Sequence, residues 1–566
     1  RPADHGVGDF TTPAQLLEAA GAAGLDAVGI NPLHALFPYD PERASPYSPS
    51  DRRRLDPLYV DLARLGADLG LDLRLDAPDD GPRVDYPQIR AARRARGARA
   101  FAAVRDRLGE DDALGRSVRA FSEQGGEALA RFALHQALTR EHGDDWRRWP
   151  APLRDAEPAA LTQARLRLRG DIDRILFEQW AADRQLADAS RRGREAGLCL
   201  GLYRDLAVGA APDGAEAWAN RSRLLAGLSI GAPPDPLGPL GQVWGLPAPD
   251  PLAATREAGR AFADLIADNM RHAGALRIDH ALGLARLFVV PEGASGAEGC
   301  YLAQPMAINF ARLALESARA ECLVVGEDLG TAPEGFHDTL EKAAVLSYRV
   351  VWFERDGEAF RPPQAYPHLA AACVTTHDLP TLAGWWAGED IEERAALGLT
   401  GAQEADAARL ARAKEKRAFL DALRSAGLLT GVLDADGAYD PRLAVAAHAF
   451  VAATPALLAL GQAEDCVGEP IAVNLPGTDR ERPNWRRRLS TDVAAILASP
   501  ALAPLRRPAV GEAGSEGKRK AAARPPPSWR AKRSHPSWSA PPSGQRAASP
   551  SQKAAAWIAS ALRASQ

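Results

Sequence analysis

The chain has 566 residues, of which 46% are hydrophobic and 25% charged, as is ordinary for a globular protein. A formal net charge of −4 gives no reason to expect a nucleic acid or a membrane surface as the main partner. The 5 cysteines form no C-x-x-C pair, which argues against a disulfide framework or a thiolate zinc site and favours a reducing, cytoplasmic location. No apolar run approaches the roughly 20 residues of a membrane span. The polar N-terminus lacks Met and a signal peptide, so we expect the sequence to begin part-way into a larger protein.

The first part of the chain reads as the beginning of an α/β barrel. Residues 25–31 (LDAVGIN) predict a first strand, and residues 71–77 (LDLRLDA) alternate apolar and polar residues as a second strand would. Between them lies a turn-rich loop at 32–57 that contains Ser45 and Tyr47. In a barrel, the loops that follow strands carry substrate contacts. The alternative is an ordinary surface loop.

A long helical block separates these strands from the next one. Residues 85–188 are rich in Ala, Arg, Leu and Glu and are helical in pattern almost throughout. Because this block exceeds the length of one barrel helix, we expect an inserted helical subdomain at approximately 85–190. The apolar run 197–207, which carries Asp205 near its end, then predicts a third strand.

A segment rich in glycine and proline follows at 231–245. It lacks the GxxxxGK[ST] pattern of a phosphate-binding loop. So much Gly and Pro cannot continue a helix or a central strand, and we expect a long ordered loop. Gln242 and Trp244 near its end favour a lid over a pocket, with a plain structural connection as the alternative.

Three later apolar runs each end on an acidic residue. The runs are 274–280 (GALRIDH), 322–329 (CLVVGEDL) and 372–378 (ACVTTHD), and the acids are Asp279, Glu327 and Asp378. Active-site residues of a (β/α)8 barrel stand at the carboxyl ends of its strands. The pattern therefore predicts a TIM barrel with helical insertions that brings three carboxylates to one mouth. A single acid at a strand end is usually solvated or caps a helix, but three in succession are less easily explained in that way.

Cleavage of a glycosidic bond requires two carboxyl groups with different tasks. In a retaining enzyme one attacks the anomeric carbon and the other protonates the leaving oxygen, at a separation of about 5–5.5 Å. Asp279 suits the nucleophile because the nearby Arg277 favours its ionised form, and Glu327 suits the acid/base. Asp378, beside His377, suits a group that grips sugar hydroxyls and stabilises positive charge at the anomeric carbon. Two aromatic residues are candidate platforms for a sugar ring: Tyr47 and Trp244.

Two other functions are compatible with the same residues. A divalent-metal site, as in metal-dependent sugar isomerase barrels, could draw on six side chains: Asp279, His280, Glu327, Asp328, His377 and Asp378. The spacing gives this interpretation little support, because there is no H-E-x-x-H motif and no tight ligand spacing. A non-catalytic glucan-binding protein would be favoured if one of the three carboxylates were absent, and all three are present.

The remaining sequence predicts further barrel elements and then a change of character. Residues 346–354 and 454–460 predict strands, and residues 404–426 predict a helix. We expect the catalytic barrel to occupy residues 1–505. Residues 506–566 are basic and rich in Pro and Ser, a composition that cannot bury enough apolar surface to offset its chain entropy, so we expect a disordered tail. Nucleic-acid binding by this tail is a less favoured alternative to an extension without function.

Several motifs together identify a family. They are SPY at 45–47, GAPPD at 231–235 with GQVWG at 241–245, ALRIDH at 275–280, VGEDLG at 325–330, THDLP at 376–380 and NLPGT at 474–478. With them the chain resembles the 4-α-glucanotransferases of the amylomaltase (disproportionating enzyme) type, glycoside hydrolase family 77 of the α-amylase clan. The resemblance runs from Gly6 to the Asn-Trp-Arg-Arg segment at Asn484 and leaves out the tail.

The resemblance implies transfer of an α-1,4-glucan segment to the 4-hydroxyl of another sugar or of glucose, with retention and without a metal or organic cofactor. Asp279 would be the nucleophile, Glu327 the general acid/base and Asp378 the transition-state stabiliser. Arg277 would contact the nucleophile and His377 the sugar. Four further residues would contact donor or acceptor: Ser45, Tyr47, Trp244 and Asn474. The nearest alternative is an α-amylase-like retaining hydrolase, and the oligomeric state stays open.

Overall fold

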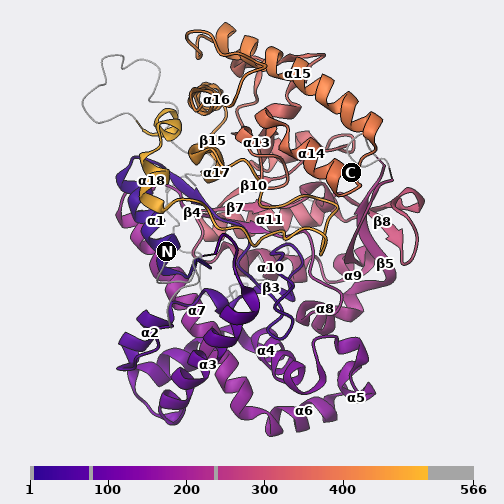
Figure 1. Ribbon diagram of the computed structural model, residues 1–566. Coiled ribbons are helices and arrows are strands. Elements are labelled where there is room, and N and C mark those ends of the chain that lie inside the picture. The colour runs from indigo at the N-terminus through magenta and orange to yellow at the C-terminus, as the bar shows by residue number, and fades with distance from the viewer. Residues whose placement is uncertain (1–5, 76–80, 235–239, 508–566) are drawn as a thin grey trace, which may run out of the picture.

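The computed structural model describes residues 6–75, 81–234 and 240–507. A parallel sheet of seven strands, in the order β1-β4-β7-β10-β11-β14-β15, occupies its centre (Figure 1). The strands are β1 (Ala27–Gly29), β4 (Gly201–Leu206), β7 (Ala275–Ile278), β10 (Leu323–Gly326), β11 (Leu346–Val350), β14 (Ala370–Cys373) and β15 (Leu458–Leu460). Their spatial order follows the chain order, as in a barrel wound in one direction. The predicted TIM-barrel type of fold is confirmed, with seven strands described where the full pattern has eight.

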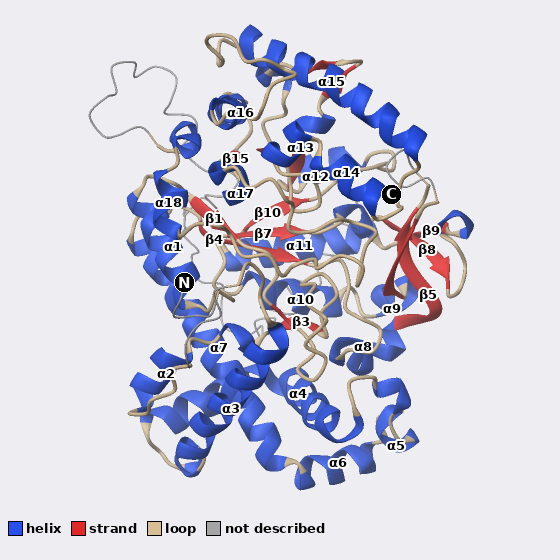
Figure 2. Cartoon of the chain, in the orientation of Figure 1, coloured by secondary structure: helices blue, strands red, loops and turns tan. Residues whose placement is uncertain are grey.

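The central strands read as continuous apolar runs because helices cover them. All residues of β4, β7 and β14 are buried, and a parallel sheet covered by helices has no solvent-facing side that would favour alternation. Figure 2 shows helices flanking this central group of strands. The predicted strands at 25–31, 197–207, 274–280, 322–329, 346–354, 372–378 and 454–460 are each confirmed over part of their length.

The predicted strand at 71–77 is wrong over its described residues. Residues 71–75 carry no strand, and 76–77 lie outside the described part of the chain. The alternation is real, since Leu73 is buried while Asp72 and Arg74 are exposed. However, β1 pairs directly with β4, from Ala27 opposite Gly201 onward, so no vacant edge remains between them. Alternation of apolar and polar residues indicates that one side of a segment is buried, but it does not indicate whether a partner strand is available.

The helical sequence between β1 and β4 forms a layer of helices below the sheet in Figure 1. Helix α1 (Thr11–Ala22) precedes β1. The helices between β1 and β4 are α2 (Leu62–Leu69), α3 (Tyr86–Val104), α4 (Ala113–His142), α5 (Ala151–Arg154), α6 (Pro158–Arg167) and α7 (Arg169–Glu195). Helix α7 connects the two regions, because Ala182 and Ala189 are fully buried in one apolar cluster with Leu17 of α1. The helical character predicted for 85–188 is confirmed, and its status as a subdomain stays a prediction.

The segment 231–245 is not a loop throughout. Gly231 and Ala232 end β5 (Leu224–Ala232), and residues 242–245 begin β6 (Gln242–Pro249). These strands belong to an antiparallel sheet with β8 (Arg286–Pro291) and β9 (Cys300–Ala303), in the order β6-β5-β8-β9. The described prolines of this segment, Pro233 and Pro234, follow the end of β5, so the strands themselves contain only its glycines Gly231 and Gly245. Residues 235–239 lie outside the described residues.

The other short strands form two small ribbons. They are β2 (His34–Ala35) with β3 (Asp51–Leu55), and β12 (Arg355–Asp356) with β13 (Ala359–Phe360). The remaining helices are α8 (Ala215–Asn220), α9 (Pro251–Arg256), α10 (Arg260–Met270), α11 (Met306–Ala320), α12 (Phe336–Lys342), α13 (Leu382–Ala387), α14 (Glu389–Ala396), α15 (Ala402–Ser425), α16 (Arg442–Ala452), α17 (Ala463–Val467) and α18 (Val493–Ala498). Helix α15 confirms the helix predicted at 404–426.

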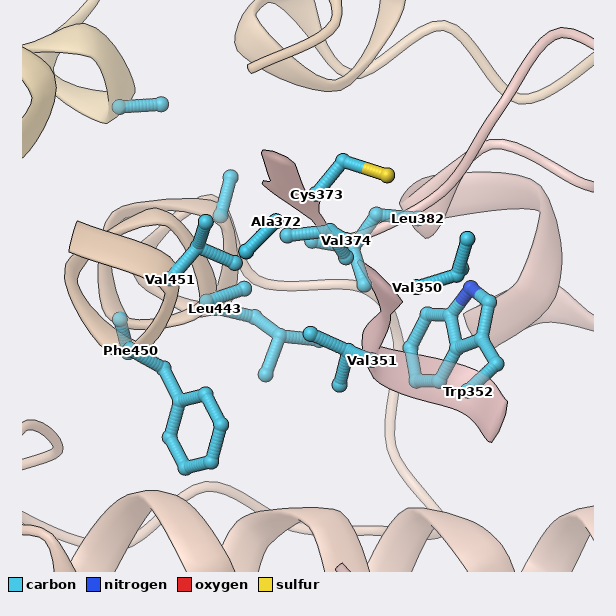
Figure 3. Packing of buried hydrophobic residues seen from close by; sticks show 14 of the residues in the cluster. Val350, Val351, Trp352, Ala372, Cys373, Val374, Leu382, Leu443, Phe450 and Val451 are labelled. Atoms are coloured by element: carbon cyan, nitrogen blue, oxygen red, sulfur yellow. The ribbon is translucent and has the colours of Figure 1, made fainter. Parts of the chain in front are cut away.

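The largest apolar cluster fixes the later strands to the helices above them. Val350 at the end of β11, Cys373 at the end of β14, and Leu443 and Phe450 of α16 all belong to it, and their packing is shown in Figure 3. Each of these side chains is at most 2% exposed, so close packing against α16 fixes the positions at which strands β11 and β14 end.

No helix in the described ranges combines the length and hydrophobicity that crossing a membrane requires. Of the tail predicted at 506–566, residues 506 and 507 are described and packed against the rest of the chain, with the Arg507 N–H donating to the Gly24 carbonyl at 2.8 Å, so disorder is not confirmed for them. Residues 508–566 lie outside the described residues.

Candidate functional site

Asp279 and Glu327 stand side by side at the ends of neighbouring strands. Strands β7 and β10 are parallel and in register, with Ile278 opposite Gly326. Asp279 and Glu327 therefore each follow directly the last paired residue of their strand. The Glu327 N–H donates to the Ile278 carbonyl at 3.0 Å, and the Ala281 N–H donates to the Glu327 carbonyl at 2.7 Å. The sheet thus brings together two carboxylates that are far apart in the sequence, as predicted.

Arg277 lies between two acids of neighbouring strands. It stands opposite Asp205 of β4, and its Nη1 donates to both Asp205 oxygens at 2.9 Å. Its Nη2 lies 2.8 Å from Oδ1 of Asp279. Both Arg277 and Asp205 are buried. A buried guanidinium with two carboxylate partners is fixed in place and directs one donor at Asp279.

The environment gives the two neighbouring acids unusual pKa values. Burial raises the pKa of Glu327 to about 7; Arg277 opposes this rise, and the charge of Asp279 adds to it. The Glu327 oxygens accept the N–H groups of His280 at 3.0 Å and Leu329 at 2.7 Å, which hold the side chain in place. Burial also raises the pKa of Asp279, against the opposing charge of Arg277. Two adjacent carboxyl groups that interact in this way share protons as a pair.

Asp378 has the opposite electrostatic environment. Its Oδ1 accepts a hydrogen bond from Nδ2 of Asn474 at 2.7 Å, and its Oδ2 lies 3.2 Å from Nε2 of His377. Burial favours the neutral acid, but these two partners outweigh it and lower the pKa of Asp378 to about 2. The Asp378 side chain is still 45% exposed, so an ionised carboxylate faces solvent where a substrate can reach it.

An aromatic group borders the acids. The rings of Tyr47 and His377 are stacked with centroids 4.8 Å apart, and Trp485 lies within 5.4 Å of the Tyr47 centroid and 5.6 Å of the His377 centroid. The Tyr47 hydroxyl donates to Oδ2 of Asp205 at 2.6 Å, which ties the ring to the Arg277 network. Ser45 accepts the Tyr47 N–H at 3.3 Å and so shapes the turn that presents this ring.

Trp244 reaches the site from the antiparallel sheet. Its ring meets that of His280 edge to face, with centroids 5.2 Å apart, and His280 directly follows Asp279. The Trp244 Nε1 donates to Oε1 of Gln242 at 3.0 Å. His280 has a positive φ of 49°, which turns the chain sharply after Asp279.

The predicted site residues thus form one connected group. Contacts link them in succession only if Asp205 is included: Asp279, Arg277, Asp205, Tyr47, His377, Asp378 and Asn474. Glu327, Trp244 and Ser45 adjoin this series. The roles of these residues stay predictions. Asp205 and Trp485 were missed as site residues. The acid near the end of the run 197–207 was the available signal for Asp205, whereas nothing in the sequence distinguishes Trp485 from a core tryptophan.

The structure does not favour the alternative of a metal site. Asp328 points away from the group: its oxygens accept the Ser347 hydroxyl at 2.6 Å and the Tyr348 N–H at 2.8 Å, both on β11. The described residues contain no cluster of three or more His, Cys, Asp or Glu side chains with an arrangement that could hold a metal ion. The six proposed ligands therefore do not form one metal-binding arrangement.

Similarity to other proteins agrees with this geometry. Residues 1–494 match the glycoside hydrolase family 77 of 4-alpha-glucanotransferases. The 4-alpha-glucanotransferase of Mycobacterium tuberculosis (strain H37Rv) is 37% identical over 509 residues, which cover 85% of this chain and 68% of that protein. The enzyme of the same name from Haemophilus influenzae is 33% identical over 524 residues, covering 88% of this chain and 75% of that protein.

Solved structures extend the likeness to the fold. The amylomaltase of Corynebacterium glutamicum superposes with a TM-score of 0.71 at 30% identity, covering 88% of this chain and 73% of that one. The amylomaltase of Streptococcus agalactiae, solved in complex with acarbose, gives a TM-score of 0.72 at 18% identity and covers 89% of this chain and 97% of that one, a likeness of fold alone. With a family match over most of its length and relatives above 30% identity, the chain belongs to the 4-alpha-glucanotransferases of glycoside hydrolase family 77.

Proposed function

We propose that the protein transfers a segment of an α-1,4-glucan to the 4-hydroxyl of an acceptor sugar by double displacement at Asp279 and Glu327. The observation that carries the proposal is the pairing of these residues at adjacent strand ends, where Arg277 forms an ion pair with Asp279 in addition to its bonds to Asp205. This ion pair supports a negative charge on Asp279 and a proton on Glu327, whose pKa burial raises to about 7. A retaining glycosidase needs this division of tasks.

In the first step Glu327 protonates the glycosidic oxygen while an Asp279 oxygen attacks the anomeric carbon. The bond from that carbon to the leaving oxygen breaks, and a β-linked glycosyl-enzyme forms. Asp378, kept ionised by His377 and Asn474, stabilises the positive charge that develops on the sugar.

In the second step Glu327, now a carboxylate, takes the proton of the acceptor 4-hydroxyl. The acceptor oxygen attacks the anomeric carbon from the face left free by the departed sugar, and the Asp279 ester breaks. Transfer exceeds hydrolysis only where an acceptor sugar displaces water from this position. We assign acceptor and donor contacts to Ser45, Tyr47, Trp244 and Asn474, and propose that the start of β6, which carries Trp244, covers the bound sugar.

Maltotriose as the single substrate tests this proposal. The active protein should convert it into glucose together with a ladder of longer and shorter oligomers at an almost constant number of reducing ends. Asp279→Asn should lower the rate by at least about a thousandfold, because it removes the nucleophile. Asp356→Asn, an exposed acid on β12, is the matched control and should leave the rate unchanged.

Two results would contradict the proposal. Products that only become shorter while reducing ends accumulate would identify an α-amylase-like hydrolase. Glucan binding without turnover in the unsubstituted protein would identify a binding protein.

A further inference from the structure

A cavity lies apart from Asp279, Glu327 and Asp378, among the inserted helices. It has a volume of about 110 Å³ and is bounded by residues 35–39 and 56–65 and by α3, α4 and α7. Its apolar wall includes Leu36, Leu58, Phe132, Ile175 and Phe177. None of Asp279, Glu327 and Asp378 lines it. Protein interiors contain few voids larger than one water molecule, so a hollow of this size requires an explanation.

The wall of this cavity carries a net positive charge. Four arginines and two carboxylates line it: Arg90, Arg93, Arg94, Arg174, Asp56 and Glu178. Arg90 is paired with Asp56 through hydrogen bonds of 3.2 and 2.9 Å, and Arg174 with Glu178 at 2.6 Å. Arg94 differs from both, since it has no carboxylate partner within the described ranges. Its Nη1 donates to the Pro38 carbonyl at 3.2 Å, and its guanidinium lies 4.9 Å from the centroid of the Tyr39 ring.

Gln136 supplies a second polar group without a partner. It lies on α4 one turn after Phe132, lines the cavity and is only 9% exposed. Its side-chain amide makes no hydrogen bond to any residue that the structure describes. A buried amide that lacks a partner costs about 1–3 kcal/mol, so such groups normally face a ligand or water.

We propose that this cavity binds a small organic anion with an apolar body, of the size of an aromatic monocarboxylate. The apolar body lies against Leu36, Phe132 and Phe177, and the carboxylate accepts hydrogen bonds from Arg94 and Gln136. Arg94 is partly exposed whereas the three apolar residues are buried, so the charged end of the ligand lies toward the surface. An arginine fork and an amide together match the oxygens of one carboxylate.

A sugar fits the cavity less well. A pyranose ring presents hydroxyls on all sides, and each would need a polar partner. Apart from the Tyr39 hydroxyl, the other polar side chains of the wall are already engaged. Gln179 accepts the Leu55 N–H at 3.2 Å and donates to the Leu55 carbonyl at 2.7 Å, and Asp56 is occupied by Arg90. The free polar groups thus suffice for one carboxylate and leave most ring hydroxyls unpaired.

Isothermal titration calorimetry of the full chain with benzoate tests the proposal. We expect saturable binding of one benzoate per chain, weakened about tenfold or more by Arg94→Met and by Gln136→Leu, because each removes a hydrogen bond to the charged group. Benzyl alcohol, which has the same ring without the charge, should bind about tenfold more weakly than benzoate. Asp279→Asn should bind benzoate as tightly as the unsubstituted protein, which separates this site from the catalytic one.

Arg99→Met is the matched control, because Arg99 is an exposed arginine of α3 that does not line the cavity. It should leave the affinity for benzoate unchanged, and circular dichroism should show that all the variants are folded. The proposal is overturned if benzoate gives no saturable binding at millimolar concentrations. It is equally overturned if Arg94→Met binds benzoate as Arg99→Met does, or if benzyl alcohol binds as tightly as benzoate.

Discussion

At the scale of single residues, the site separates three carboxyl groups by what touches each of them. Asp378 contacts Asn474 and His377, and its pKa is lowered to about 2. Glu327 is surrounded by protein and by the charge of Asp279, and its pKa is raised to about 7. The same functional group is thus ionised at neutral pH in one position and still partly protonated in the other.

The raised pKa of Glu327 has a consequence for stability. Its pKa moves from 4.5 to about 7 on folding, so between these values the native state binds a proton that the unfolded state has released. Stability therefore falls as the pH rises through this window, by about 1–3 kcal/mol in total. Glu327→Gln has no carboxyl group to ionise and escapes this loss.

We therefore expect Glu327→Gln to unfold at a higher temperature than the unsubstituted protein at pH 8, by roughly 1–4 °C, with a smaller difference at pH 4.5. Differential scanning calorimetry at the two pH values measures this. The transfer rate of the same variant should fall by about a hundredfold to ten-thousandfold, because the general acid is lost. An equal shift in unfolding temperature at both pH values would contradict the assignment of the proton to Glu327.

At the scale of elements, a turn-rich segment after α17 positions Asn474 beside Asp378. Arg482, only 5% exposed, holds this segment together. Its Nη2 donates to the Ala472 carbonyl at 2.7 Å, its Nη1 to Oδ1 of Asn484 at 2.6 Å, and its Nε to Oε1 of Glu393 on α14 at 2.9 Å. Asn484 in turn accepts the N–H of Leu475, the residue after Asn474, at 3.1 Å. Arg482 is thus a positioning residue for Asn474.

Arg482→Leu should lower kcat/KM for maltotriose disproportionation by about tenfold or more, because Asn474 is no longer held against Asp378. Stability should fall as well, since the buried partners lose hydrogen bonds worth about 1–3 kcal/mol. Arg480→Leu, a substitution at an exposed arginine in the same segment, is the control and should change neither quantity. A lower unfolding temperature with unchanged kcat/KM would show that Arg482 serves stability alone.

The strands and loops also show which parts of the fold could be predicted from the sequence. The strands that deliver Asp279, Glu327 and Asp378 were predictable because a covered parallel strand is mostly apolar and its carboxyl end, after which each acid follows, lies at the barrel mouth. The segment 71–75 satisfied the strand pattern but had no partner, because pairing of β1 with β4 is a property of the whole sheet. The prediction for 231–245 was wrong for the opposite reason: its Gly and Pro content excluded a strand over the whole segment, whereas β5 ends before Pro233 and β6 begins at Gln242.

At the scale of the whole molecule, the sheet brings together groups from five widely separated segments. Tyr47 comes from the loop between β2 and β3, Asp205 from β4, Arg277 from β7, His377 from the segment after β14 and Asn474 from the closing segment. Sequence motifs identify most of these residues singly, but which one touches which follows only from strand order and register. The contact between Asp205 and Arg277, for example, exists because β4 and β7 pair in the register that places them opposite each other.

The role of Asp279 can be tested by trapping the glycosyl-enzyme. A 5-fluoro-α-glucosyl fluoride carries a leaving group that needs little acid assistance, and its ring fluorine destabilises the positively charged transition state, so the covalent intermediate accumulates. After proteolysis, mass spectrometry should place one fluoroglucosyl group on Asp279, and excess maltose should restore activity by accepting that sugar. A fluoroglucosyl group on Glu327 or Asp378, or full transferase activity in Asp279→Asn, would contradict this mechanism.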